Sequence, residues 1–515
     1  MHKTLATIKR RLGKAIPLIL LPAGISLSPA LLAADISIMQ YGARGDGRFI
    51  NTKAIQRAID DCSKTGGRVL VPAGQFVTGT LYLKSNTTLY LEKGALLLGS
   101  LDTLDYPANS PRTITCLDTH GRNGRSKRNS TLIYAEDQDN ISIAGEGTID
   151  GQGDKKQYQR GDNGHDRPKL ILLISCRNVV IRDVFLTNSA FWMQDYLGCD
   201  GLRIQGIRVL NHANWNNDGI DIDSRNVIVS DCDIDSDDDG ICLKSYLRDA
   251  PCENVTITNC RVATNCDAIK MGTPGAGGFK NIAISNCVVR PSKYDNFRHW
   301  KATDKYISAD ASMVNGISIE CVDGGATEDI VMDNITMKGV QTPIFIRVGN
   351  RNEKLNSDTA RVSSMRNVIL SNIISDQLSR RTSSITAIPG SYIENLQLSH
   401  ILFNIYSEGT AEDAQAPVAE KENSYPSPHS FGATLPAYGF YIRHVNTLTL
   451  SDVQLNVMKG GEQRYPMVME DTHNGYINNC LLKKADGETR LLSGTPADIK
   501  VTGSSDIHID HKRMN

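Results

Sequence analysis

The chain has 515 residues, of which 40% are hydrophobic and 22% are charged, and its formal net charge at pH 7 is −1. A nearly neutral chain has no strong field for nucleic acid or an anionic membrane, so neither is expected as its main partner. The cysteines form no CxxC pair and the histidines form no cluster at zinc spacing, so no metal site is predicted.

The first 34 residues have the pattern of a secretory signal peptide. Residues 1–14 carry five lysines and arginines, residues 15–32 are mostly apolar, and Ala33 and Ala34 follow. This order is typical of an exported protein that is cut near Ala34. A membrane anchor is the alternative, but three prolines interrupt an apolar run that is already short for a spanning helix. We therefore expect an exported protein, periplasmic or secreted, with a mature chain of residues 35–515.

Residues 51–67 predict a short amphipathic helix near the mature N-terminus. Asn51 is a candidate N-cap, the apolar residues between Ala54 and Cys62 fall on one face, and two glycines end the helix. A narrow apolar stripe suits a helix that covers the open end of a stacked structure. We expect such an N-terminal cap within about residues 35–75. A surface helix without a special role is the alternative.

Nine segments share one pattern, in which a turn-forming residue precedes alternating apolar and polar residues. They are NVVIRDVFL (178), GLRIQGIRV (201), NVIVSDCDI (226), NVTITNCRV (254), NIAISNCVV (281), DIVMDNITM (329), NVILSNIIS (367), NLQLSHILF (395) and TLTLSDVQL (447). They recur every 23 to 28 residues where no insertion intervenes, and they show no helical stripe. This period is typical of a parallel β-helix, whose coils stack along one axis. We therefore predict one all-β solenoid domain.

The seventh residue of each segment is apolar and forms a row that is expected to fill the solenoid. The row consists of Val184, Ile207, Cys232, Cys260, Cys287, Ile335, Ile373, Ile401 and Val453. The three cysteines are expected to pack as small apolar side chains. An exported protein also permits disulfides between other cysteines.

Seven further runs are interpreted as one strand in successive coils: SAFWMQD (189), DGIDIDS (218), DGICLKS (239), DAIKMGT (267), NGISIEC (315), TPIFIRV (342) and YGFYIRH (438). Their third and fifth residues are apolar and face inward, so the first, fourth and sixth lie at the boundary or outside. The first column then reads Ser189, Asp218, Asp239, Asp267, Asn315, Thr342 and Tyr438. Stacked strands lie about 4.8 Å apart, so Asp218, Asp239 and Asp267 are expected to form a ladder of carboxylates beside Asp238.

Such a ladder is unfavourable as a purely structural turn, because like charges repel and asparagine would give the same turn without charge. Glycosidic hydrolysis explains it better. An inverting glycosidase needs one carboxylic acid to protonate the leaving oxygen and another carboxylate to activate a water. Mutual repulsion raises the pKa of one group, which then keeps its proton near neutral pH. A calcium-binding or solvated acidic turn is the alternative.

Two motifs in tandem resemble glycoside hydrolase family 28, the polygalacturonases: NNDGIDID at 216–223 and SDDDGICLKS at 236–245. YGARGDG at 41–47 and VDGG at 322–325 extend the resemblance over most of the mature chain. The resemblance implies a single-stranded, right-handed parallel β-helix and inverting hydrolysis without a cofactor.

Roles follow from the resemblance position by position. Asp238 matches the general acid, and Asp218 and Asp239 match the carboxylates that hold and activate the water. Asn216 matches the asparagine that opens the first motif, and it is expected to bind substrate. Asp237 stands where the family often has glycine, so it is not assigned a catalytic role.

The third and fourth coils depart from the family pattern. Cys266, Asp267 and Ala268 stand where the family has Gly-His-Gly, and Ser318 and Glu320 replace the cations of Arg-Ile-Lys. Those cations hold the carboxylate of a galacturonate unit in polygalacturonases. We therefore expect Asp267 and Glu320 to bind substrate differently, Glu320 through sugar hydroxyls, and we do not expect ordinary endo-cleavage of polygalacturonate.

Other cations lie elsewhere in these coils. Lys244 and Lys270 are close to the acids and are candidate substrate contacts, with neutralisation of the ladder as the alternative. Arg347, with Arg351 nearby, is the better candidate for a uronate carboxylate, because a guanidinium fork makes two hydrogen bonds to it.

Two insertions are expected to shape the cleft, one at about residues 292–314 and one at about residues 407–436. Aromatic and histidine side chains that suit sugar stacking, with loop packing as the alternative, are Trp192, His212, Trp215, Tyr294, Phe297, His299, Trp300 and Tyr306. The second insertion either closes one end of the groove, which would favour attack at a chain end, or lies apart from it.

The sequence thus predicts a monomeric or weakly associated hydrolase of a pectin-type polysaccharide or oligosaccharide. An exo-acting enzyme on a branched pectic side chain is the nearest alternative. A polysaccharide lyase with Lys270 as a base, and a non-catalytic carbohydrate-binding solenoid, are the alternatives from other classes.

Overall fold

The computed structural model describes residues 34–107, 109, 130–158, 167–294, 313–351, 361–482, 489–494, 497–504 and 507–512. Residues 1–33 of the predicted signal peptide and residues 295–312 of the first predicted insertion lie outside this set. In the described part of the chain, no helix is both long and apolar enough to cross a membrane.

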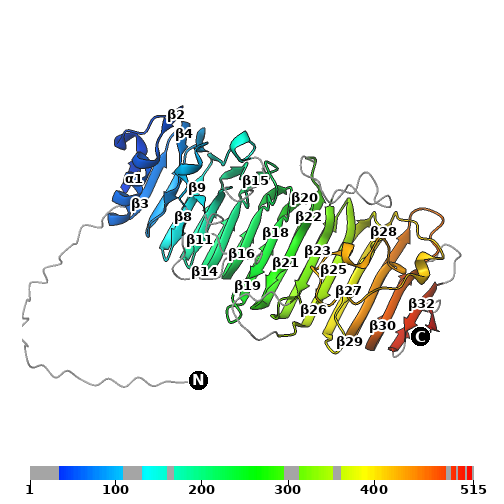
Figure 1. Cartoon of the computed structure of the whole chain (residues 1–515). Helices are drawn as coiled ribbons and strands as arrows, with labels where there is room; N and C mark the ends of the chain where they lie inside the picture. Colours follow the sequence, from blue (N-terminus) through cyan, green and yellow to red (C-terminus); the bar gives the residue numbers. More distant parts are fainter. Residues whose placement is uncertain are drawn as a thin grey trace, which may run out of the picture.

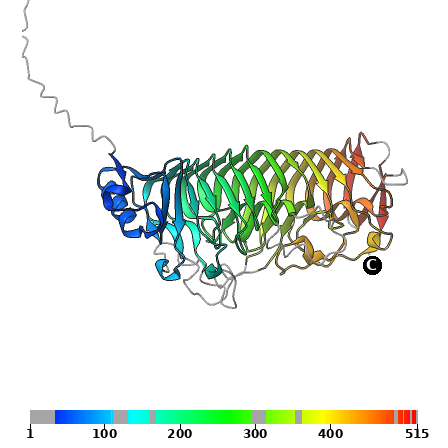
Figure 2. The ribbon, with the colours of Figure 1, turned by 90° about the horizontal axis from the view of Figure 1, so that it is seen from above.

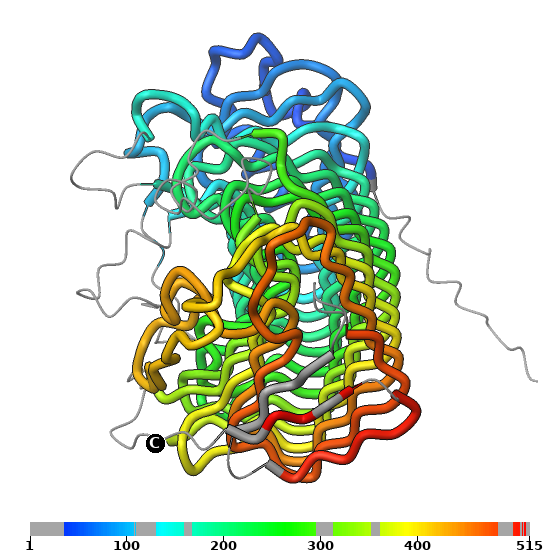
Figure 3. The backbone as a smooth tube through the Cα atoms, turned by 90° about the vertical axis from the view of Figure 1, so that its right-hand side faces the viewer, coloured from blue at the N-terminus to red at the C-terminus, as the bar shows by residue number. Residues whose placement is uncertain are grey.

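The strands form one large sheet that winds into a solenoid with three faces, and the pairings between the named strands are parallel. Corresponding strands of successive coils lie side by side (Figure 1), and Figure 3 shows coils of similar outline stacked in chain order from the blue N-terminal part to the red C-terminal part. The fold is therefore the predicted right-handed parallel β-helix.

One face, named the site face, consists of β5 (Leu81–Tyr82), β8 (Thr131–Glu136), β11 (Lys169–Ile174), β18 (Ile241–Ser245), β21 (Asp267–Gly275), β23 (Met313–Cys321), β25 (Val340–Val348), β27 (Ser383–Thr386), β32 (Thr489–Gly494) and β34 (Ile507–Lys512). The second face consists of β1 (Ala34–Ser37), β3 (Gly67–Val71), β6 (Thr87–Leu91), β9 (Asp139–Gly145), β12 (Arg177–Arg182), β19 (Cys252–Thr258) and β33 (Ala497–Thr502).

The third face consists of β2 (Asp46–Ile50), β4 (Gly74–Thr78), β7 (Ala95–Gly99), β10 (Thr148–Asp150), β13 (Phe185–Thr187), β15 (Arg208–Asn211), β17 (Asp233–Ser236), β20 (Arg261–Thr264) and β31 (Leu481–Leu482). Longer strands bend from one face to the next: β14 (Gln194–Gln205), β16 (Ile220–Ser230), β22 (Gly278–Pro291), β24 (Ala326–Met337), β26 (Ser364–Gln377), β28 (Ile393–Ile405), β29 (Ala437–Val457) and β30 (Tyr465–Asn478). Short 3₁₀ helices are η1 (Ile38–Tyr41), η2 (Thr103–Asp105), η4 (Lys156–Tyr158), η5 (Asp413–Gln415) and η6 (Pro428–Phe431).

The turn-forming residue at the start of each repeat adopts a left-handed backbone conformation. Asn226, Asn254 and Asn281 have φ angles of 56°, 55° and 52°. Asparagine is one of the few residues that tolerates this region. The amide of Asn254 donates to Asn226 (3.1 Å), and that of Asn281 donates to Asn254 (2.8 Å). The sequence pattern thus comes from a backbone requirement and a side-chain ladder together.

The predicted interior row is buried at every position. Cys232, Cys260 and Cys287 are among these residues and carry free thiols, as expected for small apolar packing groups. Every cysteine in the described part of the chain is free and buried.

The predicted cap helix is α1 (Thr52–Thr65), which packs against β1, β3, β5 and β6 at the N-terminal end of the stack. Its buried residues run from Ala54 to Cys62 along the predicted stripe. Asn51 precedes the helix, but its side chain makes no capping hydrogen bond. Its amide group instead exchanges hydrogen bonds with the backbone of Arg44 (2.7 and 3.1 Å).

The predicted register of SAFWMQD is wrong by three residues. Asp195 pairs with Asp221 across β14 and β16, so Trp192, rather than Ser189, lies next to Asp218 in the first column. The cause is a polar side chain inside the solenoid. Gln194 is fully buried, where its amide donates to the carbonyl of Gly219 (3.1 Å) and accepts from the hydroxyl of Tyr196 (2.8 Å).

Candidate active site

The ladder of carboxylates forms just before the site-face strands begin. β16 pairs with β18, and β18 pairs with β21. The amide of Gly219 donates to the carbonyl of Asp239 (2.8 Å), and the amide of Gly240 donates to the carbonyl of Asp267 (2.8 Å). Asp218, Asp239 and Asp267 therefore stack on three consecutive coils.

The glycine after each of the first two aspartates is required by packing between coils. A Cβ atom on Gly219 would lie 2.6 Å from the carbonyl oxygen of Gly240, and one on Gly240 would lie 2.4 Å from a methyl carbon of Val262. Both distances are well inside van der Waals contact. The Asp-Gly pairs thus bring the aspartate-bearing turns of adjacent coils close together.

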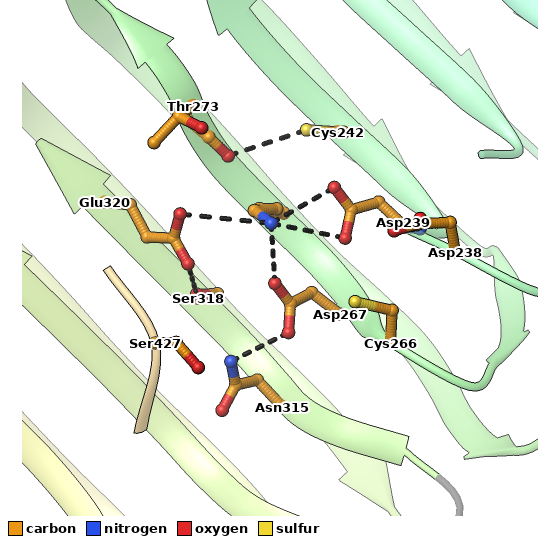
Figure 4. A network of polar contacts seen from close by, with 12 residues as sticks. Asp238, Asp239, Cys242, Cys266, Asp267, Thr273, Asn315, Ser318, Glu320 and Ser427 are labelled. Atoms are coloured by element: carbon orange, nitrogen blue, oxygen red, sulfur yellow. Dashed lines mark hydrogen bonds and ion pairs between the residues drawn. The ribbon is translucent and has the colours of Figure 1, made fainter. Parts of the chain in front are cut away.

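The ammonium of Lys270 lies among three carboxylates, those of Asp239, Asp267 and Glu320, which Figure 4 labels. Its Nζ is 2.8 Å from Asp267 Oδ2, 3.1 Å from Asp239 Oδ2 and 3.9 Å from Glu320 Oε2. All four side chains are at most 7% exposed. Burial favours the neutral amine, but the three carboxylates outweigh it and raise the pKa of Lys270 well above its ordinary value.

The carboxylates of this network have partners of their own. The amide of Asn315 donates to Asp267 Oδ1 (2.7 Å), and the hydroxyl of Ser318 donates to Glu320 Oε1 (2.8 Å). Burial raises the pKa of Glu320 to about 8, although Lys270 opposes the rise. Burial thus favours the protonated form of Glu320, and Lys270 favours the ionised form.

Lys244 is a second buried cation and lies next to Asp218, the first aspartate of the ladder. Its Nζ is 3.1 Å from Asp221 Oδ1, 4.0 Å from Asp218 Oδ2 and 4.9 Å from the ring centroid of Trp192. Burial raises the pKa of Asp221 to about 7, with Lys244 opposing the rise. The ladder is thus bordered by a buried cation on each side.

Asp238 differs from its neighbours because its side chain is partly exposed, whereas Asp218 and Asp239 are 3% and 5% exposed. Desolvation and the charge of Asp239 raise the pKa of Asp238 to about 7. Burial, followed by the charges of Asp221, Asp238 and Asp239, raises the pKa of Asp218 well above its ordinary value. The surroundings of Asp239 therefore favour the protonated forms of Asp238 and Asp218, the kind of environment that tunes a carboxyl group for acid–base chemistry.

Residues 63–418, well over half of the chain, match the family model described as Glycosyl hydrolases family 28. The chain belongs to this family.

Curated relatives agree with this assignment. A probable polygalacturonase of Vitis vinifera is 32% identical over 274 residues, covering 50% of this chain and 55% of the relative. An exo-poly-alpha-D-galacturonosidase of Dickeya chrysanthemi is 30% identical over 310 residues, covering 49% of this chain and 50% of the relative. The family 28 chain thus spans about half the length of these relatives.

Solved structures share the fold. The hyperthermoactive exopolygalacturonase of Thermotoga maritima aligns with a TM-score of 0.57 at 22% identity, over 72% of this chain and 87% of that one. The family 28 exopolygalacturonase of Yersinia enterocolitica aligns with a TM-score of 0.54 at 18% identity, over 93% of this chain and 77% of that one.

Asn216 lies beside the ladder in the family 28 motif, with a left-handed φ of 54°. The guanidinium of Arg167 donates to its Oδ1 (3.2 Å) and also to the carbonyl of Ala190 (3.2 Å). Arg167 thereby fixes the loop before Asp218. Arg167 could not be found from the motif, because it lies 49 residues before Asn216 in the chain.

Arg347 lies opposite Glu320 across β23 and β25, but the contacts of its guanidinium lie elsewhere. Its guanidinium donates to Thr386 Oγ1 (3.1 Å) and to the carbonyls of Ala387 (2.8 Å) and Glu420 (2.5 Å), and its side chain is 3% exposed. Burial lowers its pKa to about 10. The predicted grip on a uronate therefore has no geometric support, and the visible role of Arg347 is to hold the second insertion.

The second insertion, residues 407–436, lies against the outside of the coil stack (Figure 2). Besides Arg347, the guanidinium of Arg443 donates to the carbonyl of Val418 (2.8 Å), and the amide of Asn350 donates to the carbonyl of Glu422 (2.8 Å). These contacts fix its path across the site face.

The insertion brings Tyr425 near the Lys270 network. The charge of Lys270 lowers the pKa of this phenol, but desolvation of the hydroxyl and the charge of Glu320 outweigh it and raise the pKa. The guanidinium carbon of Arg351 lies 5.4 Å from its ring centroid, and Arg351 also forms a two-point ion pair with Asp323 (2.8 and 2.9 Å). Tyr425 remains 51% exposed, so one side of it is open to a ligand.

Three further ionisable residues of the site face were missed in the sequence. Asp221 pairs with Lys244, and Lys169 forms a buried ion pair with Asp195. The Nζ of Lys169 lies 4.5 Å from the ring centroid of Trp192. Asp221 stands in the fourth column of the seven aligned runs. Because the predicted register of SAFWMQD was wrong, Asp195 was not aligned with Asp221.

Asp238, Asp239 and Cys266 each place one potential ligand atom within 4.8 Å of the others. Burial raises the pKa of the Cys266 thiol well above its ordinary value, and a protonated thiol is a poor metal ligand. These residues therefore give no argument for a bound metal.

Proposed function

We propose that this family 28 chain is an exported, inverting hydrolase of glycosidic bonds in a pectin-type polysaccharide or oligosaccharide. The observation that carries the proposal is the stack of Asp218 and Asp239 on adjacent coils, with Asp238 next to them and partly exposed. Export rests on the pattern of residues 1–34, and the carbohydrate partner rests on family membership.

Asp238 is the proposed general acid. Its carboxyl is the accessible member of the trio, and a pKa of about 7 lets it keep a proton up to neutral pH. Asp239 has Lys270 as its counter-charge at 3.1 Å and is the proposed base. Asp218 is buried beside both and would hold the attacking water.

The proposed step is a single displacement. Asp238 gives its proton to the glycosidic oxygen as the bond from that oxygen to the anomeric carbon breaks. Water attacks the anomeric carbon from the opposite face and gives a proton to Asp239. The new hemiacetal has the inverted configuration, and one further proton exchange with solvent restores both carboxyl groups.

Ordinary endo-cleavage of polygalacturonate is not the proposed reaction. At the position next to the acids, the cation of Lys270 is already shared among Asp239, Asp267 and Glu320. A fourth carboxylate from a uronate would face more negative than positive charge there. A neutral sugar at this position, as in exo-attack on a branched pectic side chain, fits the charges better.

A lyase is less well supported. β-Elimination needs a base that is free to take a proton, and Lys270 is held protonated by its three partners. A purely carbohydrate-binding solenoid would leave the raised pKa of Asp238 without a use.

A proton NMR time course with homogalacturonan, rhamnogalacturonan and branched pectic oligosaccharides tests the proposal. We expect a sugar in the inverted anomeric form from a substrate other than plain homogalacturonan. Products that absorb in the ultraviolet as unsaturated uronides would indicate a lyase, and a retained anomer would exclude the single displacement.

A further inference from the structure

A second cluster of polar and ionisable side chains gathers around the imidazole of His212. His212 lies in the loop between β15 and β16, Asp235 and Asp237 lie at the end of β17, and Ser292 lies just after β22. His212, Asp237 and Ser292 are buried. The proposed mechanism uses none of these residues.

His212 faces a carboxylate from each ring nitrogen. Its Nε2 is 2.8 Å from Asp235 Oδ1 and 3.1 Å from Ser292 Oγ, and its Nδ1 is 3.7 Å from Asp237 Oδ1. The ring of Tyr294 packs on the imidazole at 5.0 Å between centroids. The other charged group of the cluster is Arg290, which lies 3.6 Å from Asp235 Oδ2.

Asp237 directly precedes Asp238 in the chain and is fixed by hydrogen bonds of its backbone and its side chain. Its backbone amide donates to the carbonyl of Asn211 (2.9 Å), and its Oδ1 accepts from the amide of Asn265 (2.8 Å). The same amide of Asn265 donates to the carbonyl of Tyr294 (2.8 Å). A buried carboxylate with fixed partners acts as a fixed charge on its neighbours.

The negative charge of Asp237 and the positive charge of a protonated His212 have opposite effects on Asp238. Negative charge on Asp237 disfavours a second negative charge beside it, and it contributes to the raised pKa of Asp238 after desolvation, Asp239 and the opposing Lys270. Burial disfavours the imidazolium of His212, but the hydrogen bond to Asp235 and the charges of Asp235 and Asp237 outweigh burial and raise the pKa of His212.

We propose that Asp237 and His212 are a pair of positioning residues that set the pH range of the reaction by acting on Asp238. Asp237 supplies a fixed negative charge that favours the protonated form of Asp238, and the imidazolium of His212 limits this effect. The proposal rests on the proposed role of Asp238 as general acid.

The test is the pH dependence of kcat/KM for Asp237→Asn and His212→Gln on the substrate found by NMR. We expect the alkaline limb to move to lower pH in Asp237→Asn, by about 0.5 to 1 unit, the order that one nearby charge produces. In His212→Gln the alkaline limb moves to higher pH. In the variant with both substitutions, His212→Gln causes no further shift relative to Asp237→Asn alone. Asp233→Asn on the same strand, whose carboxylate pairs with Arg261 at the surface (2.8 Å), is the control and leaves the limb in place.

A limb that does not move in Asp237→Asn, or an equal His212→Gln shift in both backgrounds, overturns the proposal. NMR titration of the His212 ring in the wild-type protein is a second measurement that needs neither a variant nor a substrate. There a His212 pKa at or below its ordinary value overturns the proposal. If Asp238→Asn stays active, the proposed function fails as well; if Asp238→Asn is inactive and the limbs do not move, only the pair fails.

Discussion

Replacing Lys270 with methionine should destabilise the solenoid strongly and in a pH-dependent way. The substitution removes an ammonium whose Nζ lies 2.8, 3.1 and 3.9 Å from the carboxylates of Asp267, Asp239 and Glu320. At an effective dielectric constant of about 20, one ion pair near 3 Å amounts to about 5 kcal/mol before desolvation is counted. Deleting only the cation of a buried network typically costs about 3–5 kcal/mol, because the carboxylates stay buried without a partner.

The sign of the pH dependence follows from the carboxylates. Burial raises the pKa of Glu320 and of Asp267 above their unfolded values already in the wild type, with Lys270 opposing the rise. Without Lys270 these pKa values rise further. The folded variant then binds protons more tightly than the unfolded chain, so its stability is greatest at low pH and falls as the pH rises toward neutrality.

Denaturant unfolding at pH 5 and pH 7.5, followed by tryptophan fluorescence and circular dichroism, measures the effect. The matched control is Lys280→Met, because Lys280 is 41% exposed and lies 3.9 Å from Glu328 at the surface. The control should change the free energy of unfolding by about 0.5 kcal/mol or less. A Lys270→Met protein that loses no more stability than the control at pH 7.5, or loses equal amounts at both pH values, would refute the reasoning.

Further outcomes follow from individual contacts. Asp238→Asn should lower kcat by about 10²–10⁴-fold, the range of general acid catalysis, with an unchanged circular dichroism spectrum; a rate near wild type would contradict the assigned role. In the wild type, kcat/KM should fall as the pH rises above about 7, since the pKa of Asp238 is about 7 and only its protonated form donates; a profile flat to pH 9 would count against this. Gly240→Ala should cost about 1–3 kcal/mol in unfolding free energy, because its Cβ meets the next coil at 2.4 Å, whereas Gly460→Ala, with open space around it, should be nearly neutral. Arg347→Ala should expose residues 407–436 to limited proteolysis, detected by mass spectrometry, and equal cleavage in variant and wild type would remove its anchoring role.

Much of the fold could be predicted because a solenoid repeats one local rule. Asn254 and its equivalents mark each turn, and the alternation after them marks the inward rows. Because each coil contacts mainly its neighbours, aligned residues become stacked residues. The column of Asp218, Asp239 and Asp267 is therefore visible in the sequence.

The sequence by itself determined the coil architecture, the cap helix and the stacking of the acidic residues, because these depend on period and on short-range turn chemistry. Only the tertiary structure decided which side chains pair with one another. The burial of Gln194 shifted Trp192 into the first column, since an interior hydrogen bond replaced the apolar contact that the alignment assumed. In the structure, Lys270 pairs with three carboxylates from different coils. Arg347 donates hydrogen bonds to the backbone of an insertion about 70 residues away in the chain. Such pairings depend on where long loops return and on how buried charges are neutralised, and neither follows from the local pattern.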